Sequence, residues 1–165
     1  MNNDRDFEDE TQEAEEFVVR SLGAQDLDNI VRIDAHASGR ARPEYYRIKL
    51  KRALEETSVR ISLAAEKDNI MVGFLMASVY YGDFGQFEPV ATLEDISVLP
   101  SFAKRGVGRA LFKQFVRNVK AMRVERIQTQ VDWSNWALLS FLRRMNFMPA
   151  PRICIERRLD FEKDD

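Results

Sequence analysis

The chain has 165 residues, of which 45% are hydrophobic, and a formal net charge of −2 at pH 7. This length and apolar content suit one well-packed domain, and the chain is too short for two ordinary ones. One cysteine, Cys154, excludes an internal disulfide, and one histidine, His36, leaves too few soft ligands for a typical zinc site, so we expect no metal. No apolar run approaches the roughly 20 residues that span a bilayer, and the first residues are acidic where a signal peptide is basic, so we expect a cytoplasmic protein without a membrane partner.

The first sixteen residues are strongly acidic, whereas the rest of the chain has a net positive charge. Residues 1–16 contain eight acidic side chains and one basic side chain, a charge of −7, so residues 17–165 carry +5. This segment has too few apolar residues to build a core, so we expect a disordered tail at 1–16, a single domain at 17–161 and a charged end at 162–165. The tail can simply confer solubility, or it can act as a mobile acidic arm over a basic substrate or cofactor mouth.

The domain is predicted to begin with a strand and two helices. The strand covers 17–22, and the first helix covers 25–36. The second helix begins at Pro43, whose missing N–H is tolerated in the first turn of a helix. Its apolar stripe comprises Tyr46, Leu50 and Leu54.

Four basic residues of the second helix fall outside this stripe. They are Arg47, Lys49, Lys51 and Arg52. The simplest interpretation is a solvated helix face. Contact with nucleic acid is the alternative, and it is disfavoured because no aromatic side chains for base stacking are interleaved with the basic residues.

A β-hairpin is predicted after the second helix. The runs 59–66 and 70–81 are apolar and β-prone, and the polar residues 67–69 between them suit a tight turn. A loop at 82–89 then leads to the next strand.

The most informative stretch is the basic, glycine-punctuated turn at 100–109. A β-prone run at 91–99 precedes it, and a helix with apolar residues at one-face spacing follows it. Main-chain N–H groups at a helix start lack intrahelical partners, and the helix dipole is positive there, so an anion is favoured. Gly106 and Gly108 leave those donors accessible, which predicts a pyrophosphate site. The turn lacks the spacing of a nucleotide P-loop and the third glycine of a dinucleotide-binding turn.

The C-terminal part supplies the last elements of the predicted sheet. A strand at 126–131 precedes a helix at 135–145, for which Ser134 provides the N-cap, and a strand at 153–161 completes the sheet. Hairpins combined with one strand–helix–strand crossover predict an α/β fold of three layers around a central mixed, mostly antiparallel sheet. Cys154 lies between two isoleucines of the last strand and is predicted to be a core residue rather than a nucleophile.

Three segments of the chain resemble the GNAT superfamily of N-acetyltransferases. The strand at 93–98 and the turn and helix start at 105–111 are similar to its coenzyme A-binding segment. The segment 19–34 resembles its first strand and helix, and Asn135 followed by Asn146-Phe147 is similar to its later segment. Together they cover nearly the whole predicted domain in the family's order. The resemblance implies the GNAT fold and transfer of an acetyl group from acetyl-CoA to a primary amine.

Three positions depart from the family pattern. Ala103 stands where Gln or Arg is common, so one side-chain contact to the pyrophosphate is lost. Leu142 stands where a tyrosine frequently serves as the acid that reprotonates the departing thiolate, so the acid is unassigned. Asn146 replaces the glycine that usually ends the helix, and asparagine tolerates the left-handed conformation that such an end requires.

The resemblance also implies which residues hold acetyl-CoA. Main-chain groups of the strand pair with the pantetheine arm, an amide N–H at Val98 polarises the thioester carbonyl, and Asn135 either hydrogen-bonds the arm or only caps its helix. The predicted cofactor-binding residues are Ile96, Ser97, Val98, Ala103, Lys104, Arg105, Gly106, Val107, Gly108, Arg109, Asn135 and Phe141.

A general base is needed because an amine with a pKa of about 10 is protonated at neutral pH. Glu94 is the first candidate, at a position similar to the acidic residue that many GNAT enzymes use. If the strand alternates regularly, Glu94 shares a side with Ile96 and Val98, and burial there would raise its pKa. Alternatively, Glu94 only neutralises a nearby cation. Asp95 takes the role of base if a bulge reverses the facing.

The predicted function is N-acetyl transfer by direct attack in a ternary complex. The alternative is a non-catalytic coenzyme A-binding sensor or scaffold, which the missing tyrosine and Ala103 favour, and a module associated with nucleic acid is a third reading. The acceptor is an amine on a small molecule, a protein lysine or a protein N-terminus. Tyr80, Tyr81 and His36 are candidates for lining its pocket. The oligomeric state stays open, with a homodimer as one option.

Overall fold

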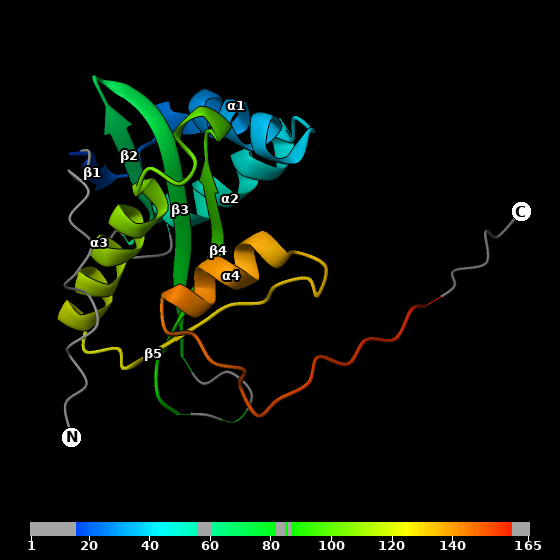
Figure 1. Cartoon of the computed structure of the whole chain (residues 1–165). Coiled ribbons are helices and arrows are strands. Elements are labelled where there is room, and N and C mark those ends of the chain that lie inside the picture. The colour runs from blue at the N-terminus through cyan, green and yellow to red at the C-terminus, as the bar shows by residue number, and fades with distance from the viewer. Residues whose placement is uncertain (1–15, 56–60, 82–84, 86, 160–165) are drawn as a thin grey trace, which may run out of the picture. The chain divides into compact units, whose positions relative to one another are not determined.

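The computed structural model describes residues 16–55, 61–81, 85 and 87–159 (Figure 1). The described residues divide after Gln130 into two compact units. The predicted charged end lies outside the described residues, as does the predicted tail apart from Glu16. These two predictions are therefore untested, and the single domain at 17–161 also stays a prediction.

A mixed sheet organises the first unit. Within the described residues its five strands lie in chain order: β1 (Val18–Ser21), β2 (Leu63–Lys67), β3 (Ile70–Tyr80), β4 (Val90–Val98) and β5 (Arg126–Gln128). Strands β1 to β4 pair antiparallel, whereas β4 and β5 pair parallel. A parallel pair needs a crossover connection, which helix α3 (Val107–Ala121) supplies. The predicted mixed, mostly antiparallel sheet is confirmed.

The hairpin between β2 and β3 turns through two residues in the left-handed region. Asp68 has φ 51° and Asn69 has φ 62°. Two-residue hairpin loops of type I′ need a positive φ at both central positions, and Asp and Asn accept this conformation better than most side chains. The hairpin is therefore formed where the polar residues 67–69 predicted it.

Helices cover both faces of the sheet (Figure 1). The helices α1 (Leu27–Ser38) and α2 (Pro43–Glu55) lie on one face; the short 3₁₀ helix η1 (Ala24–Asp26) precedes α1. On β3, the Phe74 ring lies 5.7 Å from the Tyr46 ring of α2, whereas a Cβ added to Gly73 would lie 2.9 Å from Val107 Cγ1 of α3. Because successive strand residues face opposite sides, α2 and α3 must lie on opposite faces. The predicted three-layer α/β fold is confirmed.

Apolar side chains fill both layers between helices and sheet. Helix α3 buries one face at the spacing i, i+4, i+8, i+12, which is the pattern of an amphipathic helix. Its buried residues are Val107, Leu111, Phe112, Phe115 and Val119, and those of α1 and α2 include Ile30, Ile33, Tyr46 and Leu50. No helix of the described residues has the length and apolar character needed to cross a bilayer.

The second unit contains helix α4 (Trp136–Arg144). Its N-cap is Asn135, whose Oδ1 accepts a hydrogen bond from Leu138 N at 3.1 Å, so the predicted cap at Ser134 is wrong by one residue. The Ser134 hydroxyl instead contacts the Asp132 carboxylate. Asn146 has φ 62°, as predicted for the residue that ends this helix.

The predicted last strand is not formed in the described residues of 153–161. Residues 153–159 have no strand conformation, and all of them are exposed. Cys154 is exposed as well, so its predicted place in the core is wrong. An alternating apolar run forms a strand only where a neighbouring strand supplies hydrogen bonds, and here none is paired with it.

Candidate active site

A β-bulge interrupts the pairing of β3 with β4. Met76 pairs with Asp95, but its neighbour Ala77 pairs with Leu93, so Glu94 is the extra residue. A bulge of this kind disturbs the alternation of side chains along the strand. As a result, Glu94 and Asp95 both contact the same residue of α2, Lys49.

The bulge overturns one expectation about Glu94. Val98 lies opposite Gly73 and contacts the side of that glycine that faces α3, so Val98 and Ile96 point toward α3. Glu94 points toward α2 instead. The predicted burial of Glu94 between Ile96 and Val98 is therefore wrong, because the extra residue shifts the facing that regular alternation would give.

Three donor groups converge on the Glu94 carboxylate. The Ser78 hydroxyl forms a short hydrogen bond to Oε1, and the Tyr80 hydroxyl donates to the same oxygen at 3.2 Å. Lys49 Nζ lies 3.5 Å from Oε2. The Glu94 side chain is 24% exposed, so its carboxylate is held in one place and still reaches solvent.

Asp95 is joined to a partly buried polar chain that runs from α2 through the exposed Arg42 to α1. The Tyr46 hydroxyl donates to Asp95 Oδ2 at 2.8 Å, and Arg42 Nη2 lies 3.3 Å from the same hydroxyl. Arg42 in turn forms a two-pronged ion pair with Asp34, at 2.9 and 2.6 Å. Burial raises the pKa of Asp95, and the charge of Lys49 and the bond from Tyr46 offset this only in part. Burial, followed by the charge of Asp95, raises the pKa of Tyr46.

Lys49 is the cation shared by the two carboxylates. Besides Glu94, its Nζ lies 3.8 Å from Asp95 Oδ2 and donates to the Tyr45 hydroxyl at 3.1 Å. Burial by itself would lower the pKa of Lys49, but the bond to Tyr45 and the charges of Asp95 and Glu94 outweigh burial and raise it. Lys49 is therefore an ammonium at neutral pH.

The place of Lys49 corrects the interpretation of the basic cluster on α2. Lys51 and Arg52 are exposed, as a solvated face requires, and Arg47 pairs with Glu44 on the surface. Lys49, however, has a side chain that is only 15% exposed. The sequence carried one hint of this, because Lys49 lies three residues after Tyr46 and directly before Leu50, at the border of the buried stripe.

Of the three residues predicted to line the acceptor pocket, one contacts Glu94 and, within the described residues, the other two contact neither carboxylate. Tyr80 contacts Glu94 and so belongs to the cluster. Tyr81 is exposed, and the described residues show no bond from it to the two carboxylates. His36 is exposed on α1, where its Nδ1 lies 2.8 Å from Arg32 O. Arg42 and Asp34, which sequence reasoning missed, belong to the same polar chain as Asp95.

Strand β4 has an edge that β5 only partly covers. Pairing with β5 ends at Thr92, and Thr129 Oγ1 then donates to Leu93 O at 2.8 Å. Leu99 N donates to Val72 O on the β3 side, so alternation along the ladder directs the N–H and C=O of Val98 and Ile96 away from β3. These main-chain groups face the side on which no β5 residue of the described chain is paired with them.

The turn before α3 exposes its basic residues and carries two positive φ angles. Lys104 has φ 60° and Gly106 has φ 91°. Gly106 is the N-cap of α3 and, having no side chain, supplies no capping hydrogen bond of its own. The Arg105 guanidinium lies 4.6 Å from the centroid of the Phe102 ring. Exposed residues of the turn are Ala103, Lys104, Arg105, Gly106 and Arg109, whereas Val107 is buried.

The last two predicted cofactor residues belong to the second unit. Asn135 caps α4, which agrees with the simpler of its two predicted roles. Phe141 lies within α4 and is partly buried. A cofactor role for either residue stays a prediction.

Known proteins resemble this chain over most of its length. The family model described as the acetyltransferase (GNAT) family matches residues 25–147. An N-alpha-acetyltransferase of Sulfurisphaera tokodaii is 23% identical over 145 residues, which cover 84% of each chain.

Solved structures of two acetyltransferases share the fold. The aminoglycoside N-acetyltransferase AAC(6′)-Iy in complex with CoA superimposes with a TM-score of 0.73 at 21% identity, covering 87% of this chain and 95% of that one. The ribosomal-protein-S18-alanine N-acetyltransferase from Escherichia coli has a TM-score of 0.67 at 20% identity, covering 82% of this chain and 79% of that one. The family match spans well over half of the sequence and agrees with the three-layer fold. The chain therefore belongs to the GNAT family of acetyltransferases.

Proposed function

We propose that this protein is an N-acetyltransferase that transfers the acetyl group of acetyl-CoA directly to a primary amine within a ternary complex. The single observation that carries the proposal is the bulge at Glu94, which sets a carboxylate with three donors beside the partly uncovered edge of β4. Membership of the GNAT family and the CoA complex of a fold neighbour support the choice of cosubstrate.

The residues present fit a ligand with a diphosphate and an extended arm. A helix start with glycine at the N-cap and with Lys104, Arg105 and Arg109 nearby suits the diphosphate, because main-chain N–H groups and the helix dipole favour anions there. Ile96 and Val98 direct main-chain groups to the uncovered edge, where an arm can pair as an added strand. Ser97 is a poorer candidate for that pairing, because its main chain faces β3. Acetyl-CoA supplies the activated acetyl thioester when bound.

Glu94 is the proposed general base. An acceptor amine must lose a proton before it attacks, and a base has to lie within hydrogen-bond reach of that proton. The two side chains are almost equally exposed, Glu94 at 24% and Asp95 at 20%, but Asp95 is tied to the buried Tyr46 hydroxyl. Asp95, whose pKa burial raises, is the second candidate, and the bulge at Glu94 is the condition under which the sequence favoured it. In this role Ser78 and Tyr80 hold the Glu94 carboxylate in place.

No side chain is proposed as the general acid. Leu142 occupies the position where the family often has tyrosine, and it is buried. A thiol with a pKa of about 8.5 gives a thiolate that can leave and take its proton from water.

The second candidate function is a coenzyme A-binding sensor without catalysis, which Leu142 and Ala103 favour. Two measurements separate it from the enzyme. Calorimetry with CoA tests binding, and mass spectrometry tests acetyl transfer to a panel of peptides, protein lysines, polyamines and aminoglycosides. Transfer to any amine supports the enzyme, binding without transfer supports the sensor, and the absence of CoA binding at millimolar concentration contradicts both.

A further inference from the structure

The Glu94 and Asp95 carboxylates already hold an ammonium of the protein itself. Lys49 Nζ lies 3.5 Å from Glu94 Oε2 and 3.8 Å from Asp95 Oδ2. Tyr45 fixes the ammonium from its own helix through a 3.1 Å hydrogen bond, and the Tyr45 ring centroid lies 5.2 Å from Nζ. An acceptor amine that approaches Glu94 therefore meets a carboxylate pair that is half neutralised.

The charged groups around this pair leave one negative charge. Asp34 of α1 is matched by Arg42 through two hydrogen bonds. On β4, the two carboxylates of Glu94 and Asp95 face the single ammonium of Lys49. The remaining described hydrogen bonds of these groups are with hydroxyls, namely those of Ser78, Tyr45, Tyr46 and Tyr80.

We propose that Lys49 determines which amines this site accepts: it leaves room for one ammonium and disfavours polycationic acceptors such as polyamines and aminoglycosides. The inference rests on the proposed function, in which Glu94 receives the proton of the acceptor. An acceptor nitrogen within hydrogen-bond reach of Glu94 Oε2, about 3 Å, lies within about 6.5 Å of Lys49 Nζ, because Nζ is 3.5 Å from the same oxygen. A second ammonium on the same acceptor then meets Lys49 with no carboxylate left to offset it.

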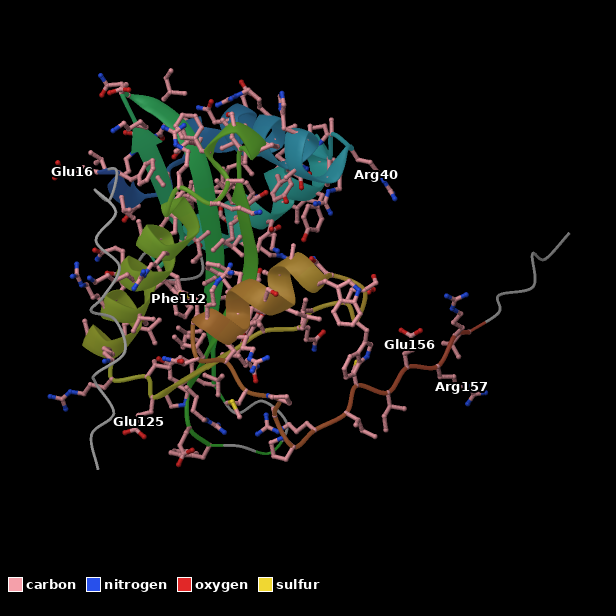
Figure 2. All side chains as sticks on the ribbon, viewed as in Figure 1. Glu16, Arg40, Phe112, Glu125, Glu156 and Arg157 are labelled. Carbon is pink, nitrogen blue, oxygen red and sulfur yellow. The ribbon has the colours of Figure 1, made fainter. Side chains whose placement is uncertain are left out.

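Exposed basic residues also lie on α2 and on the connection before it, although α2 ends on the exposed Glu55. The connection between α1 and α2 and the exposed part of α2 carry Arg40, Lys51 and Arg52, all exposed. Figure 2 shows the Arg40 side chain projecting outward at the end of this connection. Glu44, the acidic residue in the first turn of α2, is paired with Arg47. A peptide or other acceptor with one amine avoids the repulsion that Lys49 imposes on a second ammonium.

The size of the effect follows from the distance. A second ammonium that lay as close to Lys49 Nζ as the reacting nitrogen, about 6.5 Å, would at an effective dielectric constant of about 20 be repelled strongly enough to weaken binding roughly 70-fold. Salt and the solvent around a half-buried group reduce this, so we expect Lys49 to disfavour a polycation by a factor of about ten.

The test compares two methionine variants of the same helix, K49M and K51M. Each removes one positive charge, but only Lys49 touches the carboxylates. The acceptors are a peptide whose α-amine is its sole amine, and spermidine. We expect K49M to raise the ratio of kcat/KM for spermidine to that for the peptide about tenfold, and K51M to leave the ratio within twofold of the wild-type value. K49R keeps the charge and should keep the wild-type ratio.

Equilibrium binding separates this inference from the proposed function. Calorimetric titration with spermidine needs no turnover, and we expect it to show about tenfold tighter binding to K49M than to the wild type. An unchanged affinity in K49M, or an equal gain in K51M, overturns the inference even where acetyl transfer is found. Absence of transfer to every amine overturns the proposed function, while the titration still decides the role of Lys49. If K49M does not fold, as circular dichroism would show, K49Q takes its place in the same measurements.

Discussion

Replacing Tyr46 by phenylalanine removes a single buried hydroxyl from the polar chain beneath the candidate site. Tyr46 is fully buried, its hydroxyl donates to Asp95 at 2.8 Å, and Arg42 lies 3.3 Å from the same oxygen. The ring and its edge-to-face contact with Phe74 are retained. A hydrogen bond to a charged group contributes about 1.5–3 kcal/mol, so we expect Tyr46→Phe to lower the free energy of unfolding by about 2 kcal/mol at pH 7.

The loss should depend on pH in a defined direction. Burial holds the pKa of Asp95 above its ordinary value in the folded state, and the Tyr46 bond is one of the groups that lower it. Without the hydroxyl this pKa rises further. A carboxyl whose pKa is higher in the folded than in the unfolded state destabilises the fold increasingly as the pH rises through that window. The cost of Tyr46→Phe should therefore shrink on acidification, because a protonated Asp95 no longer needs the donor.

Urea unfolding of the wild type and of Tyr46→Phe at pH 7 and at about pH 4.5 measures both effects. The neighbouring Tyr45→Phe is the matched control, since Tyr45 is 44% exposed and its hydroxyl bonds only to Lys49 among the described partners, so we expect a loss below about 0.5 kcal/mol. A loss for Tyr46→Phe as small as that of the control, or one of equal size at both pH values, would refute the reasoning.

Three further predictions concern the base, the turn and a buried ion pair. Glu94→Gln should lower kcat by at least about a hundredfold while CoA affinity by calorimetry stays within twofold; weaker CoA binding in proportion to kcat would contradict a role as base. Gly106→Ala, at φ 91°, should cost about 1–2 kcal/mol of stability and weaken CoA binding, whereas Gly39→Ala, at φ 75°, should cost about the same and leave CoA binding unchanged. Burial would raise the pKa of Asp26, but the bonds from Arg20 and a main-chain N–H lower it, so Asp26→Asn should destabilise the protein above about pH 4, with the difference from the wild type disappearing at lower pH. A loss for Asp26→Asn that is unchanged by pH in denaturation curves would contradict the ion-pair explanation.

Local signals in the sequence predict most of the first unit. The polar turn at 67–69, Pro43 at the start of α2 and the glycine turn before α3 each have a physical effect within a few residues, and the structure has all three elements at those places. The predicted strand at 153–161 is wrong because its formation depends on residues distant in the sequence. A strand depends on a partner strand, and an alternating pattern alone does not supply one.

The candidate site was predictable in its residues and less so in its geometry. Glu94 and Asp95 could be named from the sequence, together with the condition that a bulge would change their facing, but the position of that bulge depends on the register between β3 and β4. The spacing of apolar residues along α2 separates its buried face from its exposed face, and this predicts an exposed Lys49. The spacing does not show that the Glu94 carboxylate of β4 lies opposite Lys49, at the border of the buried face. Arg42 and Asp34 were missed because their contact joins α1 to the connection that precedes α2, which no local pattern in the sequence indicates.

The extra residue in β4 determines on which face of the sheet the Glu94 carboxylate lies. If Leu93 were removed, β4 would run in step with β3 and Glu94 would pair with Ala77, so the Glu94 carboxylate would point toward α3, away from Lys49. A deletion of one amino acid here would thus dismantle the acid cluster without altering the chemistry of any neighbouring side chain. Insertions and deletions in this strand should accordingly be far less tolerated than exchanges of one apolar residue for another.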